Sequence, residues 1–211
     1  MAYLYLGRHA KSEWNDKGIW TGWADPHLSK EGFDDALKAG QALKGRKIDK
    51  AYVAPFFRTR ETLETIEEAY GAKIEKIEAA EIKERDYGVL TGKNKWQVKE
   101  AVGEEQFQKI RRGWDVPIEK GESLKDVYNR VIPYFKSQIL PELLAGKNVI
   151  IVSSGNALRA LVKFIENIPD EKIGEVEIVM GQIHKYIYDG DGKYIGKEVV
   201  YSGTVDTQNT K

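Results

Sequence analysis

An arginine and a histidine stand side by side as Arg8 and His9, directly after the short apolar segment 2–7. Ser12 and Asn15 follow within a turn, and they carry, like Arg8, hydrogen-bond donors suited to a phosphate or a carboxylate. An imidazole beside such donors can attack a phosphoryl group. A lone histidine is about as often a structural residue, but these neighbours favour phosphoryl chemistry at His9.

Charged residues also follow two further predicted strands. Arg58 lies near the start of a predicted helix, where free N–H groups attract anions. Glu84 is a candidate general acid, because a nearby phosphate favours the protonated form of a carboxyl group. The alternatives are a surface arginine, the role that we assign to Arg60, and a solvated charged loop. Taken together with His9, these residues predict phosphoryl transfer that uses arginine rather than a metal ion.

Alternating elements must position these side chains. Apolar or alternating patterns predict strands at 2–7, 48–54, 74–82, 148–153, 175–180, 184–189 and 194–201. Helical periodicity predicts helices at 30–43, 59–70, 124–144 (interrupted by Pro133 and Pro141) and 156–167. This order predicts an α/β fold, a three-layer α/β/α sandwich with a mostly parallel central sheet. We expect one domain over 1–201, a frayed tail at 202–211, and ligands beyond the C-terminal ends of the strands.

The composition excludes several classes of protein. The 211 residues include 33 basic and 33 acidic side chains, and the absence of cysteine excludes disulfides, thiol nucleophiles and zinc–thiolate sites. Three histidines argue against a multi-histidine metal centre, and zero net charge argues against a broad nucleic-acid surface. No apolar run reaches the roughly 18–20 residues that span a bilayer, and the N-terminus does not resemble a signal peptide. We therefore expect a soluble, cytoplasmic protein with no metal, nucleic-acid or membrane partner.

Several motifs resemble those of a known family. The segment RHAKSEWN at 8–15 resembles the RHGxSxWN motif of the histidine phosphatase superfamily. ERDYG at 84–88, Lys95 and the pair Arg111 and Arg112 resemble the branch formed by the 2,3-bisphosphoglycerate-dependent phosphoglycerate mutases. SGNALRAL at 154–161 also fits this branch, and the matching segments run in order over most of the chain.

The resemblance implies an enzyme that interconverts 2- and 3-phosphoglycerate through a phosphohistidine at His9. It implies 2,3-bisphosphoglycerate as phosphoryl donor, no metal, and a homodimer or homotetramer whose only other partner is a small phosphorylated substrate. Arg8 and Arg58 would hold the phosphoryl oxygens, and Glu84 would pass a proton to and from the substrate hydroxyl. The implied substrate-binding residues are Asn15, Thr21, Gly22, Tyr87, Lys95, Arg111, Arg112, Gly155 and Asn156.

Four positions depart from the family pattern. Ser154 stands where the family has a second catalytic histidine, and loss of such a donor typically costs roughly 10²–10³ in rate. Ala10 replaces a glycine and would be strained if its φ were positive, Ala54 lacks a hydroxyl, and Asp86 adds a negative charge. The alternatives are therefore a phosphomonoesterase or bisphosphoglycerate phosphatase on the same fold, and a pseudoenzyme that binds phosphorylated ligands.

Overall fold

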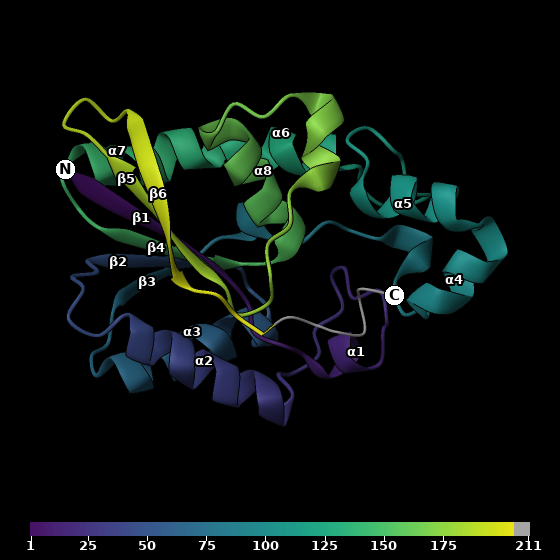
Figure 1. The fold of residues 1–211 in the computed structure, drawn as a ribbon, viewed down its shortest axis with the longest axis horizontal. Coiled ribbons are helices and arrows are strands. Elements are labelled where there is room, and N and C mark those ends of the chain that lie inside the picture. The colour runs from purple at the N-terminus through teal and green to yellow at the C-terminus, as the bar shows by residue number, and fades with distance from the viewer. Residues whose placement is uncertain (205–211) are drawn as a thin grey trace.

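The computed structural model describes residues 1–204, in which a six-stranded sheet lies between two layers of helices (Figure 1). The strand order is β3-β2-β4-β1-β5-β6. Strands β1 to β4 run parallel to one another, β5 is antiparallel to β1, and β6 is antiparallel to β5. The strands are β1 (Ala2–Arg8), β2 (Lys50–Val53), β3 (Glu75–Glu78), β4 (Val149–Ser153), β5 (Ile183–Tyr188) and β6 (Tyr194–Tyr201). The predicted three-layer α/β architecture is confirmed.

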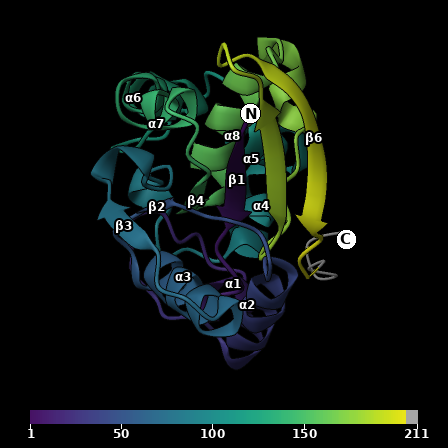
Figure 2. The same ribbon diagram turned by 90° about the vertical axis from the view of Figure 1, so that its left-hand side faces the viewer.

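The helices cover both faces of the sheet, as the view along it shows (Figure 2). On one face lie α2 (Lys30–Ala42) and α3 (Phe57–Tyr70), and on the other lie α6 (Leu124–Tyr134), α7 (Leu140–Leu144) and α8 (Gly155–Ile165). The predicted helix at 124–144 is one helical path, in which a π-helical turn over Phe135–Ile139 joins α6 to α7. This turn follows Pro133, which has no N–H to donate to the preceding turn.

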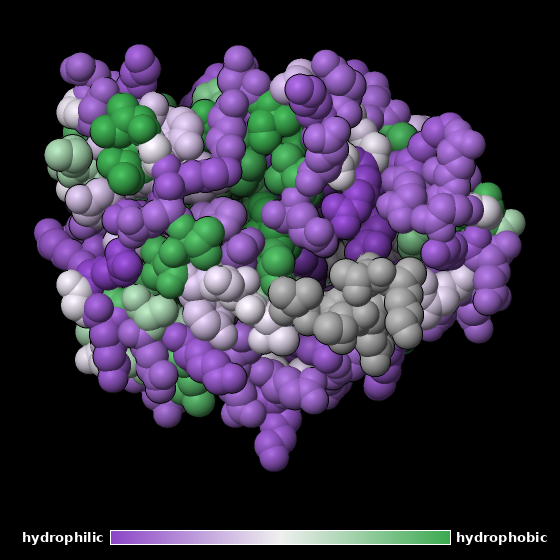
Figure 3. Space-filling view, viewed as in Figure 1, coloured by the Kyte–Doolittle hydropathy of each residue, from purple (hydrophilic) through white to green (hydrophobic). Residues whose placement is uncertain are grey.

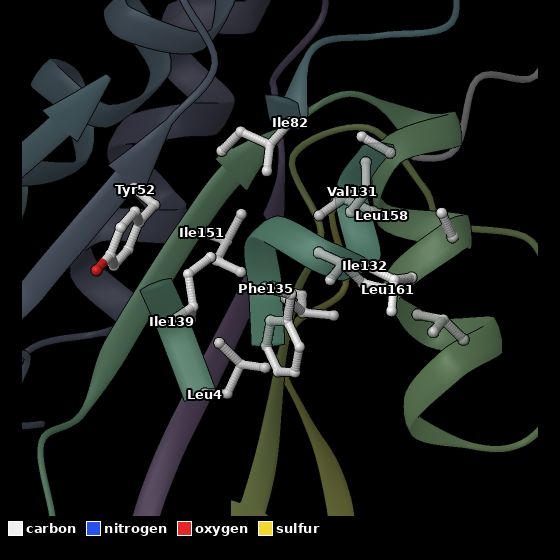
Figure 4. Packing of buried hydrophobic residues seen from close by; sticks show 14 of the residues in the cluster. Leu4, Tyr52, Ile82, Val131, Ile132, Phe135, Ile139, Ile151, Leu158 and Leu161 are labelled. Carbon is white, nitrogen blue, oxygen red and sulfur yellow. The ribbon is translucent and has the colours of Figure 1, made fainter. Parts of the chain in front are cut away.

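Side chains alternate between the two faces of the sheet. Leu4 and Ile151 point toward α6 and α8, where they pack with Phe135 and Leu161 (Figure 4), whereas Tyr5 packs on the opposite face with α2 and α3. All five side chains are at most 1% exposed. Dense packing on both faces fixes the C-terminal ends of β1 and β4, from which the candidate site is built.

A separate lobe projects beyond that end of the sheet (Figure 1). It contains α4 (Lys95–Val102) and α5 (Glu104–Arg112), neither of which the sequence pattern predicted. A small core of its own holds the lobe to the loops below it, formed by Trp20, Tyr87, Val98, Phe107 and Ile118. The Trp20 ring centre lies 4.5 Å from that of Tyr87 and 6.0 Å from that of Phe107. This packing sets the distance of α4 and α5 from the sheet.

Three predicted segments differ in the structure. The strand predicted at 74–82 is shorter, since β3 ends at Glu78 and a 3₁₀ helix follows over Ala80–Ile82. The prediction of a strand at 175–180 is wrong: a 3₁₀ helix over Asp170–Glu175 ends there, and the chain continues without a ladder partner. Side chains satisfy its backbone instead, since Arg8 Nη1 donates to the Ile178 carbonyl (2.6 Å) and Val179 N–H donates to Gln182 Oε1 (3.1 Å). Arginine and glutamine side chains thus take the place of a neighbouring strand.

The predicted frayed tail began at Ser202, but the chain is held as far as Thr204. Thr204 N–H donates to the Met180 carbonyl (3.1 Å), and its hydroxyl donates to Asp35 Oδ1 (2.7 Å). The rest of that segment, 205–211, lies outside the described residues. Between residues 1 and 204, no helix has the length and apolarity to cross a membrane.

Candidate active site

Two small adjoining cavities open at the C-terminal ends of β1 and β4. The inner lobe, about 60 Å³, is lined by Arg8, His9, Asn15, Trp20, Thr21, Gly22, Arg58, Glu84, Tyr87 and Lys95. The outer lobe, about 110 Å³, shares Arg8, Trp20, Glu84, Tyr87 and Lys95 and adds Arg111, Arg112, Gly155, Asn156, Arg159, Val176, Glu177 and Ile178. Strongly hydrophilic residues gather between α8 and α5 on this side of the molecule (Figure 3). The structure therefore brings together every predicted site residue except Ser154.

His9 follows β1 immediately and is 4% exposed. Its backbone N–H donates to the Ser153 carbonyl of β4 (2.9 Å), and its ring Nδ1 lies 2.7 Å from its neighbour's carbonyl, Ala10 O. A carbonyl only accepts hydrogen bonds, so Nδ1 carries the proton in this contact and Nε2 is left with its lone pair. The ring is held in the tautomer that a nucleophilic Nε2 requires.

The surroundings of His9 also keep the ring neutral. Burial holds the pKa of His9 well below its ordinary value, and the charges of Arg58 and Arg8 lower this pKa further. Protonation would abolish nucleophilicity at Nε2, so a lowered pKa preserves the reactive form under mildly acidic conditions. Electrostatics and hydrogen bonding thus favour the same chemical form.

An NMR titration of the three imidazoles tests this environment. His27, which pairs with Glu61 (2.5 Å), is expected to titrate above the ordinary histidine range, because Glu61 raises the pKa of His27. His9 and His184 are expected to titrate below that range, since burial lowers the pKa of each. In Arg58→Met, the pKa of His9 should rise while that of His27 stays. A titration of His9 at or above that of His27 would contradict the proposed environment.

Two arginines line the inner lobe beside His9, of which Arg58 is buried and Arg8 is half-buried. Arg58, the second residue of α3, is 1% exposed and donates to the carbonyls of Gly22 (2.9 Å) and Ala24 (2.8 Å). Burial lowers the pKa of Arg58 to about 10, so the guanidinium stays charged at neutral pH. The Nε–H groups of Arg8 and Arg58 are both buried without a hydrogen-bond partner in the structure. An anion bound beside His9 would satisfy them.

Gly22 shapes the wall of the inner lobe. Its φ is +51°, and a Cβ added there would lie 2.9 Å from Thr91 Oγ1 and 3.1 Å from the Tyr87 backbone nitrogen. Both features require glycine at this position. The tight turn presents the Gly22 carbonyl to Arg58, and so it helps to orient that guanidinium.

Glu84 lies at the junction of the two lobes. Its carboxylate oxygen Oε1 accepts hydrogen bonds from the backbone N–H groups of Arg85 (2.6 Å) and Asn156 (3.2 Å), and the side chain lines both lobes. Its backbone is fixed as well, because its carbonyl accepts from Trp23 Nε1 (2.7 Å) and Arg130 Nη2 (2.9 Å). A carboxyl group held in this way can exchange a proton with a ligand that extends from one lobe into the other.

The outer lobe carries a second group of cations. Lys95 is the first residue of α4, and Arg111 and Arg112 are the last residues of α5. All three therefore come from the pair of helices that projects beyond the sheet. Arg159, on α8, was not assigned a role from the sequence. It donates to Asn156 Oδ1 (3.1 Å) and to the Arg112 carbonyl (3.0 Å).

Arg159 orients its neighbours in the outer lobe. Because it takes the amide oxygen of Asn156, the amide nitrogen of Asn156 faces Tyr87, and it donates to the Tyr87 hydroxyl (2.8 Å). Burial lowers the pKa of Arg159 to about 10 and raises the pKa of Tyr87, so the guanidinium stays charged and the phenol stays neutral at pH 7. An arginine among the mainly apolar buried residues of α8 was the sequence signal for this role.

Three departures from the family pattern prove to lie away from the pocket. Ala10 does not have the positive φ that would strain an alanine, and its methyl group packs with Leu28 and Ala36. Ala54 belongs to the main core and lines neither lobe. Asp86 also lines neither lobe, because its Oδ1 accepts from Gly88 N–H (2.8 Å) in the local turn. Ala10 is therefore not strained by a positive φ, and the Asp86 carboxylate is bound in its local turn instead of lining the anion site.

Ser154 remains the significant departure. It is the N-cap residue of α8 and is fully buried, and its hydroxyl has no hydrogen-bond partner among the described residues. It lines neither lobe, although the next residue, Gly155, lines the outer one. The serine side chain is thus too short to take part in the pocket surface.

Known proteins resemble this chain in sequence and in fold. The family model of the Histidine phosphatase superfamily (branch 1) matches residues 4–198. A Parvibaculum lavamentivorans protein named 2,3-bisphosphoglycerate-dependent phosphoglycerate mutase is 42% identical over 200 residues, which cover 93% of this chain and 95% of that protein. A Schizosaccharomyces pombe protein named phosphoglycerate mutase is 41% identical with the same coverage. The solved structure of Bacillus stearothermophilus YhfR shares the fold, with a TM-score of 0.80 at 24% identity over 98% of each chain.

Proposed function

Because the chain belongs to the histidine phosphatase superfamily, we propose that it is a 2,3-bisphosphoglycerate-dependent phosphoglycerate mutase with His9 as its phosphoryl carrier. The observation that carries this proposal is the pair of adjoining lobes with Glu84 at their junction. The inner lobe holds the nucleophile with Arg8 and Arg58, the outer lobe adds the Arg111 and Arg112 pair, and Lys95 lines both. A ligand with a phosphoryl group at one end and further negative charge at the other fits this arrangement.

The buried polar atoms support a phosphorylated ligand. Within residues 1–204, six buried side-chain nitrogen or oxygen atoms have no hydrogen-bond partner, and four of them belong to pocket-lining residues: Arg8 Nε, Trp20 Nε1, Arg58 Nε and Arg159 Nε. All four are N–H donors. Buried donors are nearly always paired in folded proteins, so a pocket lined by them is suited to a ligand that offers many acceptor oxygens.

The proposed reaction has two related steps. In the first, Nε2 of His9 attacks the phosphorus atom of the donor, the N–P bond forms as the P–O bond breaks, and the Glu84 carboxyl gives its proton to the leaving oxygen. In the second, the hydroxyl of a phosphoglycerate attacks the phosphohistidine, the N–P bond breaks, and the Glu84 carboxylate takes the hydroxyl proton. Arg8 and Arg58 disperse the charge of the transferred group in both steps.

The cations of the outer lobe favour a mutase over a phosphatase. Hydrolysis requires only that water reach the phosphohistidine, whereas a mutase must hold the carboxylate and the other phosphate of its bisphosphoglycerate intermediate while the phosphoryl group moves. Lys95, Arg111 and Arg112 offer these groups charge-assisted contacts. Retention of the ligand between the two steps is therefore the function that we assign to the projecting lobe.

Intact mass measurement tests the proposal. Incubation with 2,3-bisphosphoglycerate should add the mass of one phosphoryl group to the chain, and a chase with 3-phosphoglycerate should remove it with formation of bisphosphoglycerate. The adduct should be lost in acid, as phosphohistidine is, and should be absent from His9→Ala. The exposed histidine variant His27→Ala serves as the matched control and should be labelled normally.

The products of the chase separate the alternatives. Release of inorganic phosphate instead of bisphosphoglycerate would assign the chain to the phosphatases, because water would then be the acceptor. A chain that binds 3-phosphoglycerate but never gains the adduct would be a phosphoglycerate-binding protein without transfer activity. Either result would overturn the proposed mutase.

A further inference from the structure

A carboxylate lies among the cations of the outer lobe. Glu177 lines this lobe together with Val176 and Ile178, and its Oε1 lies 3.3 Å from Nη2 of Arg112. The Glu177 side chain is 65% exposed and that of Arg112 is 28% exposed, so the pair stands at the rim. Glu84 has a proton to transfer in the proposed reaction, but Glu177 has no such use. A negative charge at the mouth of an anion-binding pocket opposes its ligand.

The chain holds Glu177 in this place. Ile178, the next residue, is 6% exposed, and its carbonyl accepts from Arg8 Nη1 at 2.6 Å on the pocket wall. On the other side, Val176 packs against the main core. Both flanking residues are fixed, so the backbone of Glu177 is held at the rim, within reach of the Arg112 guanidinium.

The charge of Glu177 reaches the interior of the pocket. Burial lowers the pKa of Arg8, which lines both lobes, and Glu177 is one of the charges that raise this pKa in part, after Glu84 and Tyr87. The same field acts on any phosphate or carboxylate that binds near Arg8 and Arg112. An incoming ligand must also compete with Glu177 for the Arg112 guanidinium.

We propose that Glu177 is a specificity-determining residue that weakens the binding of bisphosphorylated ligands more than that of monophosphorylated ones. The proposal rests on the proposed mutase function. The opposing energy grows with the charge of the ligand, and a second phosphate adds about −1.5 to −2 charges at pH 7. In a mutase, a looser hold on the bisphosphorylated ligand means faster exchange of the phosphoryl donor and a higher donor concentration needed to load His9.

Calorimetric titration of Glu177→Gln tests the proposal on the full chain in a His9→Ala background, where no phosphoryl transfer occurs. We expect the affinity for 2,3-bisphosphoglycerate to rise roughly fivefold and that for 3-phosphoglycerate roughly twofold or less. The difference should shrink as salt is added, because screening weakens an exposed charge. Glu177→Asp should keep the discrimination of the parent chain.

The matched control is Glu175→Gln, which removes the same charge from an exposed position two residues away that lines neither lobe. It should change neither affinity. Equal changes for the two ligands in Glu177→Gln, or the same gain in Glu175→Gln, would overturn the role of Glu177. If neither phosphoglycerate binds the His9→Ala chain at all, the proposed mutase function itself fails, and so the two failures are distinguishable.

Discussion

Replacing His9 by alanine is expected to lower the mutase kcat/KM by roughly 10⁴–10⁶-fold, as loss of the nucleophile does in other enzymes with covalent intermediates. The structure gives the reason, because His9 is the histidine that lines the inner lobe, whereas His27 and His184 line neither lobe. A coupled assay that follows 3-phosphoglycerate consumption measures the loss. Since Arg8 and Arg58 remain, 3-phosphoglycerate should still bind.

The control for this experiment is His27→Ala. The His27 side chain is 56% exposed and stacks on Phe57 at 4.4 Å, away from the pocket lining. Its removal should leave kcat/KM within about twofold, as is usual for a surface change. A His9→Ala chain that keeps more than a tenth of the parent activity, with its substrate binding intact, would show that another group carries the phosphoryl group.

Ser154→His is expected to raise kcat by roughly 10²-fold, since a single donor to the transferred group is worth about 10²–10³ in rate. The Ser154 hydroxyl is fully buried, has no hydrogen-bond partner within residues 1–204, and lines neither lobe. An imidazole is long enough to extend from the N-terminus of α8 toward Glu84 and Arg8, where it would donate to the phosphoryl oxygens. Steady-state kinetics at saturating 3-phosphoglycerate checks this result.

Packing decides whether the new ring can reach the pocket. A larger side chain at a fully buried position typically costs 1–3 kcal/mol, so Ser154→Leu is the control that adds bulk without a donor. Both variants should show a lowered Tm, but only the histidine variant should gain activity. An unchanged kcat in Ser154→His at a Tm close to that of Ser154→Leu would show that the missing histidine does not limit this chain.

The sheet was predictable where burial alone determines the pattern. The apolar runs of β1 and β4 gave their positions, because strands buried on both faces have few polar residues. The segment 175–180 begins with alternating charged and apolar residues, a pattern typical of a strand. It forms no strand, since the side chains of Arg8 and Gln182 bind its backbone. Such a replacement depends on residues far away in the sequence, which no local pattern reveals.

The projecting lobe was missed for a different reason. In α4 and α5 only Val98 and Phe107 are buried, so the apolar signal of these helices is weak. Their stability comes from contacts with Tyr87, in the loop before α4, and with Trp20, which lies far away in the chain. Tertiary packing, rather than helical periodicity, therefore determines this part of the fold.

The candidate site was predictable residue by residue, but its environment was not. The chemistry of His9, Arg58 and Glu84 and their positions after predicted strands indicated these three residues, the motif resemblance assigned their roles, and the structure brings them into one pocket. The resemblance assigned no role to Arg159, although an arginine among the mainly apolar residues of α8 was a signal for one, and it gave no indication that Glu177 stands beside Arg112, which lies 65 residues earlier in the chain. The buried charge of Arg159 and the ion pair of Glu177 indicate a role in the site only once the neighbours of these residues in the fold are known.

The strand order has a consequence for the chain while it is being made. β1 ends in Arg8, directly before His9, and lies between β4 and β5, whose sequences begin at Val149 and Ile183. Translation proceeds at roughly 5–20 residues per second. β1 is the first strand to leave the ribosome, and it cannot pair with β4 and β5 until most of the chain has been synthesised. Before then, neither Ser153, whose carbonyl accepts from the His9 N–H, nor Ile178, whose carbonyl accepts from Arg8, has been synthesised. An interrupted translation product therefore carries the histidine without the pocket that makes it reactive.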